Sequence, residues 1–255
     1  MTPAPGLPDL SGTVTCVTGA SGVIGRGIAA RFAEAGSAVA VHHRRPGAAD
    51  DVVAAIEAAG GRARAFAAEL TDDRACHALL DAVASWGGRL DALVNNAGIQ
   101  PVEALPELPA HRWREMLDAT LTSAFSCTQA AARLLRDGGS VTHVASIEAR
   151  QPAPGHVHYS AAKAALVMHA RGAALEYGPR GIRVNTVSPG LIDRPGLERD
   201  WPEGVGRWHR AAPLGRLGTP ADVGNACVFL ASPLAAWITG HDLVVDGGVT
   251  ARPTW

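Results

Sequence analysis

Short runs of apolar and β-branched residues alternate along the chain with longer segments whose apolar residues recur at helical spacing. Strands are expected at 13–18, 38–42, 63–67, 92–95, 140–145, 183–187 and 243–245. Helices are expected at 24–35, 48–59, 72–85, 110–136, 157–178 and 220–231. Because a helical crossover follows each strand, the pattern predicts an α/β, doubly wound fold, with one mostly parallel, seven-stranded sheet and helices on both faces.

The composition narrows the classes of function. The formal net charge at pH 7 is -1 and no run of Lys or Arg occurs, which disfavours nucleic-acid or polybasic membrane binding and favours a small substrate. No apolar stretch of about 18 residues or signal-peptide core is found, so a cytoplasmic location is expected. The cysteines are far apart without C-x-x-C spacing, which predicts reduced thiols and no metal site; they are Cys16, Cys76, Cys127 and Cys227.

A glycine-rich turn follows the first expected strand and opens the first expected helix, between positions 18 and 25. Glycines let such a turn be tight and let its backbone approach a pyrophosphate, whose charge the N–H groups and the helix dipole would meet. The plainer interpretation is a turn that only needs glycine at positive φ. The context favours a Rossmann dinucleotide site, and the residues expected to contact the cofactor there are Gly19, Ser21, Gly22, Val23 and Ile24.

The end of the second expected strand bears on the choice of cofactor. An acidic residue there would accept hydrogen bonds from the ribose 2′-hydroxyl of NAD(H) and repel a 2′-phosphate. The chain instead has His43, Arg44 and Arg45, and a guanidinium forms paired, charge-assisted hydrogen bonds with phosphate. This favours NADP(H), with NAD(H) as the alternative if both arginines are only solvated loop charges.

Two polar residues one helical turn apart indicate acid–base chemistry. Tyr159 and Lys163 project from one face of their expected helix. An ammonium beside the phenol and the positive ring of an oxidised nicotinamide both favour the phenolate, so a lowered pKa is expected for Tyr159. Ser146, at the end of the preceding strand, is placed to hydrogen-bond a substrate oxygen. For an isolated pair, the default would be an interface tyrosine and a solvated lysine.

Taken in order, these motifs resemble those of the short-chain dehydrogenase/reductase family, from about residue 11 to 248. The further matches are Asn95-Asn96-Ala97-Gly98, Pro189-Gly190 and Val245-Asp246-Gly247-Gly248. The resemblance implies hydride transfer between a nicotinamide and a carbonyl or alcohol, with Ser146, Tyr159 and Lys163 as catalytic residues. It implies cofactor contacts from Asn96, Ala97, Gly98, Tyr159, Lys163, Pro189, Gly190 and Ile192. Asn95 is expected to tie neighbouring strands together.

Four positions depart from the family's pattern. Val23 stands where the ordinary short members have glycine, so a different backbone path over the pyrophosphate is expected. Thr120 replaces a catalytic asparagine that holds a water near the lysine, and we expect its hydroxyl, its carbonyl or both to retain the function. Glu69 replaces an aspartate and, with Leu70, is expected to face adenine. Arg194 replaces a threonine near the nicotinamide amide, and either meets an anionic substrate or is a solvated lid residue.

The sequence thus predicts a single dinucleotide-binding oxidoreductase domain over residues 1–255. Its expected reaction is hydride transfer between NADP(H) and a small ketone or aldehyde, or a secondary alcohol, with carbonyl reduction favoured. The alternatives are an NAD-dependent alcohol dehydrogenase and a cofactor-binding protein with a non-redox or regulatory function. The substrate's identity and the physiological direction stay open.

The segments expected around the substrate are partly polar. Glu148, His156 and His158 favour polar substrates, although the default interpretation of either histidine is a loop or subunit-contact residue. The Gly- and Pro-rich segment at about 191–218 is expected to be an insertion over the substrate. Its large side chains form either an apolar lid or subunit contacts, and are Trp201, Trp208 and His209. Family resemblance implies a homodimer or homotetramer built on the helices at 110–136 and 157–178.

Overall fold

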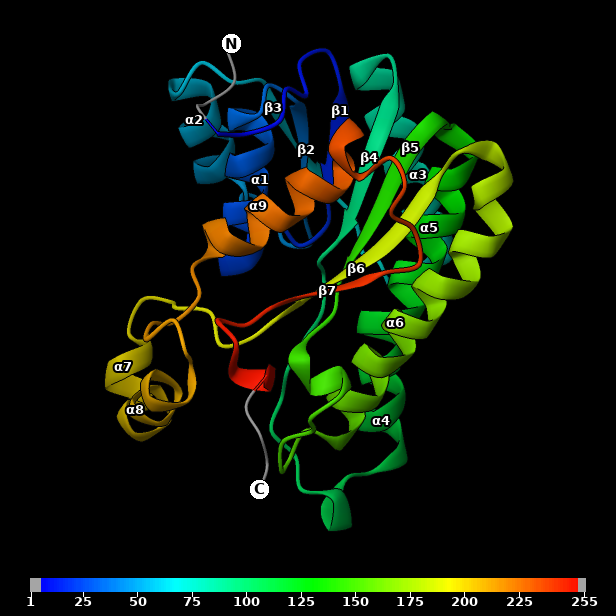
Figure 1. The fold of residues 1–255 in the computed structure, drawn as a ribbon. Coiled ribbons are helices and arrows are strands. Elements are labelled where there is room, and N and C mark those ends of the chain that lie inside the picture. The colour runs from blue at the N-terminus through cyan, green and yellow to red at the C-terminus, as the bar shows by residue number, and fades with distance from the viewer. Residues whose placement is uncertain (1–5, 252–255) are drawn as a thin grey trace.

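One parallel sheet organises the molecule. In the computed structural model, which describes residues 6–251, seven strands lie in the order β3-β2-β1-β4-β5-β6-β7, and each neighbouring pair is parallel (Figure 1). The strands are β1 (Val14–Val17), β2 (Ala38–His43), β3 (Ala63–Ala67), β4 (Leu90–Asn95), β5 (Leu135–Val144), β6 (Arg183–Pro189) and β7 (Asp242–Val245). The predicted fold class is confirmed, and the sheet is wholly rather than mostly parallel.

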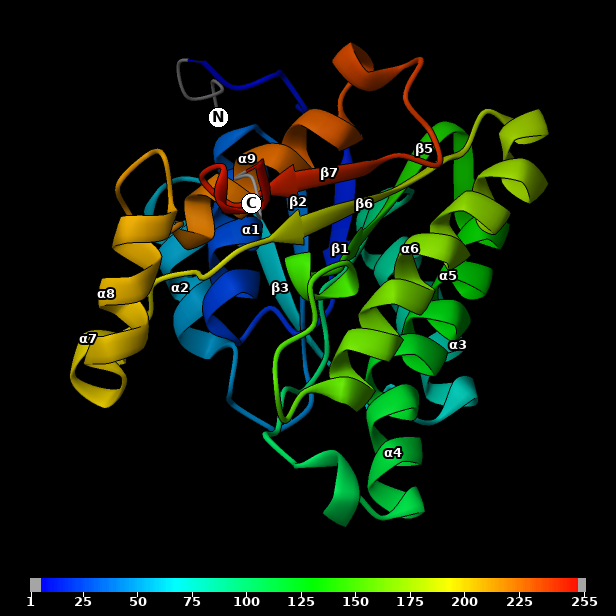
Figure 2. The ribbon, with the colours of Figure 1, turned by 60° about the horizontal axis from the view of Figure 1, so that its bottom comes forward.

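Helices cover both faces of the sheet, each over its own apolar core (Figures 1 and 2). One face carries α1 (Val23–Glu34), α2 (Asp50–Ala58) and α9 (Pro220–Ala231). The other carries α3 (Asp73–Gly87), α5 (Ser123–Leu134) and α6 (Val157–Tyr177). Phe32 lies in the first core and Leu80 in the second, both fully buried. A strand between two such cores is covered on both faces, which is why every residue of β1 is buried.

The order of the strands reverses at β1, which pairs with β2 on one side and with β4 on the other. The crevice outside the carboxyl ends of the strands at such a point is where doubly wound sheets bind nucleotides. The glycine turn follows β1 directly, and β4 ends at Asn95. The topology therefore places the turn and the Asn95–Gly98 segment beside each other at the switch point.

The region expected to form one helix at 110–136 is divided into two. It contains α4 (Ala110–Leu117), a widened π-helical turn (Asp118–Thr122) and α5. The Ser123 hydroxyl donates to the Ala119 carbonyl at 3.0 Å, and such back-bonding competes with the helical N–H ladder. The helix expected at 110–136 is therefore present over 110–134 but is interrupted by the π-helical turn, in which Thr120 lies.

Strand β5 begins at Leu135, earlier than the expected start at 140. Leu135 is buried and pairs with Leu90, after which the register of the β4–β5 pair shifts. The exposed residues between the two paired parts broke the apolar run, which is why the sequence pattern missed the start of this strand.

The segment expected to be an insertion over the substrate contains two helices, α7 (Leu197–Asp200) and α8 (Pro202–Ala211). It lies beyond the carboxyl end of β6 (Figure 2). Its base is closed where Ile192 pairs with Gly218, with Asp193 N–H donating to the Gly218 carbonyl at 2.8 Å and Gly218 N–H to the Leu191 carbonyl at 3.0 Å. α7 spans only four residues, too few to show a period of 3.6, and the proline and glycines at the start of α8 obscured that helix.

Candidate active site

The glycine turn and the segment after β4 are joined by hydrogen bonds. The Thr18 hydroxyl accepts from the N–H groups of Asn96 at 2.9 Å and Ala97 at 3.0 Å. The Asn96 amide donates to the carbonyls of Thr18 at 2.9 Å and Gly19 at 3.1 Å. Gly19 has a φ of +61°, and a Cβ there would lie 2.9 Å from Ala97 Cα. Glycine is therefore needed at position 19 both for conformation and for the close approach of the two segments.

The start of α1 offers donors to an anion. Gly22 precedes the helix without a side-chain cap, and the first turn holds no acidic residue. The N–H groups of Val23, Ile24 and Gly25 have no acceptor among residues 6–251. Unpaired amides at the positive end of a helix dipole are what a pyrophosphate requires, so this turn fits a dinucleotide. Val23 is exposed here, and a side chain in place of glycine thus meets no buried neighbour.

His42 supports the glycine turn, a role that the sequence did not reveal. Gly19 N–H donates to its Nδ1 at 3.0 Å, so the proton of the neutral ring is on Nε2, which donates to the Ala68 carbonyl at 3.1 Å. Burial lowers the pKa of His42 to about 4. The residue is therefore a neutral link between the glycine turn and the end of β3.

The end of β2 presents two cations. His43 is buried, and its Nδ1 lies 2.8 Å from the Arg45 carbonyl, whereas the side chains of Arg44 and Arg45 are exposed. Within residues 6–251 neither arginine takes part in an ion pair. The two guanidinium groups are thus available to a phosphate beside the turn.

After β3, Leu70 is buried, and Glu69 accepts from the N–H and hydroxyl of the threonine two residues later.

Tyr159, Lys163 and Ser146 lie together beyond the carboxyl end of β5. Tyr159 is 9% exposed and Lys163 is 5% exposed. Lys163 Nζ lies 5.4 Å from the centre of the Tyr159 ring and donates to the Val144 carbonyl at 2.7 Å. Ser146 Oγ accepts from Glu148 N–H at 3.1 Å and neighbours the phenol closely enough to affect its pKa. The structure therefore brings the three expected catalytic side chains together.

The pKa of Tyr159 differs in direction from the expectation. Burial raises it to about 12, the Ser146 hydroxyl acts to lower it, and the Glu148 carboxylate raises it further. Burial also lowers the pKa of Lys163 to about 8, because an ammonium loses hydration there. Desolvation of the phenol thus dominates, and the expected lowering of the Tyr159 pKa by Lys163 is not found.

Thr120 lies close to Lys163, across Gly98. A Cβ at Gly98 would lie 3.4 Å from Thr120 Oγ1 and 3.9 Å from Lys163 Nζ. The buried Thr120 hydroxyl donates to Met116 Sδ at 3.5 Å. A thioether is a weak acceptor, so this hydroxyl can exchange its partner at little cost.

Asn95 joins three elements in the interior behind this site. Its amide nitrogen lies 3.0 Å from Thr128 Oγ1 on α5 and 3.1 Å from His143 Nδ1 on β5. Desolvation lowers the pKa of His143 to about 3, so its ring is neutral and its Nδ1 accepts from the amide. The described contacts agree with the structural role expected for Asn95.

After β6 the chain continues through Gly190 into the α7–α8 segment, which the sequence predicted to lie over the substrate. Pro189 ends β6, and Gly190 follows so close to the indole that a Cβ there would lie 2.5 Å from Trp208 Cζ2. Arg194 forms an ion pair with Asp200 at 2.9 Å, which favours the interpretation of this arginine as a lid residue. Trp208 packs inward, whereas Trp201 is exposed.

The two histidines before Tyr159 differ in environment. His158 is fully buried, and neither ring nitrogen has a hydrogen-bond partner among residues 6–251. His156 pairs with Glu148 at 3.0 Å, and its ring centre lies 6.0 Å from that of Tyr159. Only His156 is therefore placed to meet a ligand beside the phenol.

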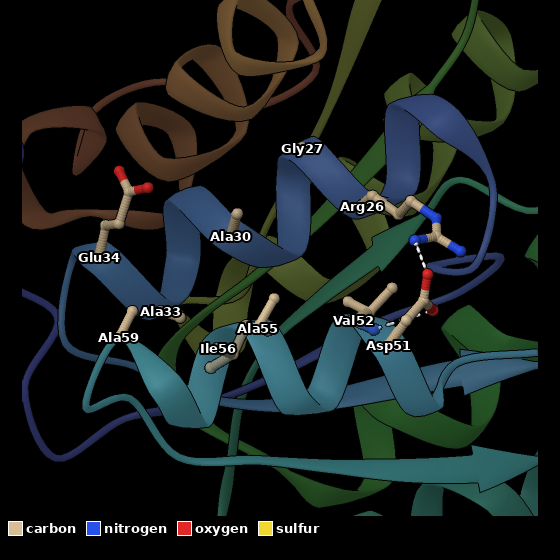
Figure 3. A pocket seen from close by; sticks show the side chains of 10 residues that line it. All are labelled: Arg26, Gly27, Ala30, Ala33, Glu34, Asp51, Val52, Ala55, Ile56 and Ala59. Carbon is tan, nitrogen blue, oxygen red and sulfur yellow. Dashed lines mark hydrogen bonds and ion pairs between the residues drawn. The ribbon is translucent and has the colours of Figure 1, made fainter. Parts of the chain in front are cut away.

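An apolar groove lies away from these residues. It encloses about 330 Å³ between α1 and α2, with small alanines along its walls and the Arg26–Asp51 ion pair at one end (Figure 3). No residue of the Tyr159 cluster lines it. The groove is therefore separate from the candidate site.

The cysteines, possible metal ligands and helix lengths were also subjects of prediction. The four cysteines are free and buried, and burial raises the pKa of Cys16 and Cys227 to about 12. Between residues 6 and 251, no cluster of three His, Cys, Asp or Glu side chains is arranged to hold a metal. None of the helices described there has both the length and the apolarity to cross a bilayer.

Known proteins resemble this chain over nearly its whole length. Residues 19–250 match the family model described as enoyl-(acyl carrier protein) reductase. The chain is 34% identical over 252 residues to glucose 1-dehydrogenase 2 of Bacillus subtilis, a match that covers 96% of this chain and 98% of that protein. Its fold matches a short-chain dehydrogenase/reductase from Serratia marcescens with a TM-score of 0.89 and 36% identity, over 94% and 99% of the two chains. The chain belongs to the short-chain dehydrogenase/reductase family.

Membership of this family confirms the resemblance seen in the motifs. A further solved structure, angucycline C-6 ketoreductase LanV with bound NADP, matches with a TM-score of 0.89 and 33% identity, over 96% of this chain and 98% of that one. The relatives are named as dehydrogenases and reductases of alcohols and ketones. The chain is accordingly an NAD(P)-dependent oxidoreductase of the short-chain dehydrogenase/reductase type.

Proposed function

We propose that this protein transfers hydride between NADP(H) and a small ketone or aldehyde, or the corresponding alcohol, and acts mainly as a carbonyl reductase. The observation that carries the proposal is the buried Tyr159, with Lys163 and Ser146 beside it, at the sheet edge that also holds the glycine turn. The ketoreductase LanV, which matches almost the whole chain, supports the direction of reduction.

The residues present fit a dinucleotide. The free amides at the start of α1 would hold the pyrophosphate, and Lys163 and Tyr159 would contact the nicotinamide ribose. Arg44 and Arg45 would bind a 2′-phosphate, which favours NADP(H) over NAD(H). When bound, the reduced cofactor supplies the hydride for the carbonyl carbon.

The chain's own residues handle the proton and orient the substrate. Ser146 would hydrogen-bond the carbonyl oxygen, and Tyr159 would donate its proton to that oxygen during reduction. A raised pKa of Tyr159 keeps the phenol protonated near neutral pH, which suits a proton donor. Lys163, with Thr120 nearby, would restore the proton.

The test is NADPH oxidation against a panel of ketones and aldehydes, with Tyr159→Phe assayed in parallel. Loss of the general acid is expected to lower kcat/KM by at least about 100-fold. Tyr177→Phe is the matched control, because Tyr177 is the other tyrosine of the chain and lies at the far end of α6. Full activity in Tyr159→Phe, or cofactor binding with no reduction of any compound, would contradict the proposal. Tighter binding of NAD than of NADP would favour the NAD-dependent dehydrogenase.

We also propose that the protein is a homodimer or homotetramer assembled through α5 and α6. Three large apolar side chains are exposed on these helices: Phe125, Met168 and Leu175. Burial of such side chains against a second copy would stabilise an assembly. Light scattering coupled to gel filtration tests this, and a monomer would refute it. The cytoplasmic location stays a prediction.

A further inference from the structure

Polar side chains from three segments converge beside Tyr159. Glu148 lies in the turn after β5, Gln100 in the loop after β4, and His156 immediately before α6. The Glu148 carboxylate accepts from Gln100 Nε2 at 3.1 Å, from His156 Nδ1 at 3.0 Å and from Ser160 Oγ at 3.3 Å. Its lone pairs are largely used by these donors. Glu148 therefore serves to hold its neighbours rather than to bind a ligand directly.

The carboxylate also decides which nitrogen of His156 carries the proton. An ionised carboxylate only accepts, so Nδ1 donates to Glu148. In the neutral form of the ring, the lone pair is then at Nε2. Nε2 has no partner among residues 6–251 and is not one of the buried unpartnered atoms of that region, so it faces accessible space. The His156 side chain is 17% exposed. A hydrogen-bond acceptor of fixed orientation thus lies near the Tyr159 ring.

The loop between Glu148 and His156 is also fixed at Arg150. Arg150 donates to the buried carboxylate of Asp242 at 2.8 Å, and that carboxylate also accepts from the hydroxyls of Thr186 at 2.7 Å and Ser188 at 2.6 Å. The Glu148 turn is consequently anchored to the edge of the sheet. Anchoring of this kind lets His156 keep its orientation before a substrate arrives.

Building on the proposed carbonyl reduction, we propose that His156 determines substrate specificity. Its Nε2 accepts a hydrogen bond from a hydroxyl on the carbon next to the reacting carbonyl, so α-hydroxy ketones are preferred over plain ketones. The His156 and Tyr159 rings, with centres 6.0 Å apart, are close enough to address neighbouring oxygens of one small molecule. A site that hydrogen-bonds a substrate hydroxyl discriminates against analogues that lack it.

The test compares 1-hydroxy-2-butanone with 2-butanone and with 1-methoxy-2-butanone, which has a similar inductive effect but no proton to donate. We expect the wild type to favour the hydroxy ketone over the methoxy ketone by at least about tenfold in kcat/KM. His156→Leu should lose about tenfold on the hydroxy ketone and change less than about twofold on the other two. His156→Gln keeps an acceptor and should retain part of the preference. The matched control, His77→Leu on α3, should alter neither.

The outcomes separate the two proposals. Reduction of all three ketones without a preference for the hydroxyl, or equal losses on all three in His156→Leu, would overturn the role of His156 and leave carbonyl reduction standing. Failure of every ketone with both NADPH and NADH would overturn both. Thermal unfolding checks that each variant is folded. If His156→Leu does not fold, the ketone preference of His156→Gln tests the role of His156 instead.

Discussion

His42 provides a quantitative test of how the cofactor site is supported. Its ring is 3% exposed and links Gly19 to Ala68, and its pKa falls from 6.5 to about 4 on folding. Near pH 5 the unfolded chain therefore binds a proton at this position that the folded chain does not. The stability that the neutral ring contributes is complete above pH 6.5 and is lost as the pH falls toward 4.

The size of this effect follows from the two pKa values. Between pH 7 and pH 5, His42 should lower the free energy of unfolding by about 2 kcal/mol. His42→Asn keeps an acceptor for Gly19 N–H but does not titrate, so the variant should be less sensitive to this pH change by the same amount. Other titrating groups are shared by both proteins, and their contributions cancel in the comparison.

The assay is urea unfolding of wild type and His42→Asn at pH 7 and pH 5, at one protein concentration because assembly would affect stability. The stability difference between the two proteins should shrink, or change sign in favour of the variant, at pH 5. An equal difference at both pH values would refute the assignment of His42 as a neutral link. Ring-nitrogen NMR shifts that show a proton on Nδ1 would refute it independently.

Three further predictions concern the chemistry of the site. Glu148→Gln removes a charge that raises the pKa of Tyr159, so the rise of alcohol oxidation with pH should move to lower pH; an unchanged profile would contradict this. Arg44→Ser should weaken NADP binding by at least about tenfold while changing NAD binding little, and Arg136→Ser, on the exposed start of β5, is the control; equal losses for both cofactors would count against a 2′-phosphate contact. Thr120→Asn should change turnover by less than about tenfold, or about 1.4 kcal/mol of barrier, and a larger gain would show that the threonine relay is poor.

The parts of the site that the sequence predicted are those encoded by short-range patterns. The glycine turn shows its context within eight residues, and Tyr159 and Lys163 are one helical turn apart. Apart from the start of β5, the strands are apolar runs with clear ends, so the number of strands could be predicted. In each case, neighbours in the chain are also neighbours in space.

The missed parts depend on long-range packing. The link made by His42 requires the ends of β2 and β3 to be in register, and the partners of Glu148 come from Gln100 and His156 in separate segments. The direction of the Tyr159 pKa was missed for the same reason, because burial depends on what the finished fold places around the phenol. Periodicity carries no information on any of these.

Because the two ends of the α7–α8 segment are hydrogen-bonded to each other, this segment can be replaced as a unit. Since Ile192 and Gly218 are held side by side, everything between them begins and ends at nearly one point on the scaffold. Such a segment can be exchanged for one of another length or chemistry while β6 and α9 keep the same attachment points. Exchange of the residues between them is therefore expected to change the proposed substrate specificity while Tyr159, Lys163 and the glycine turn stay in place.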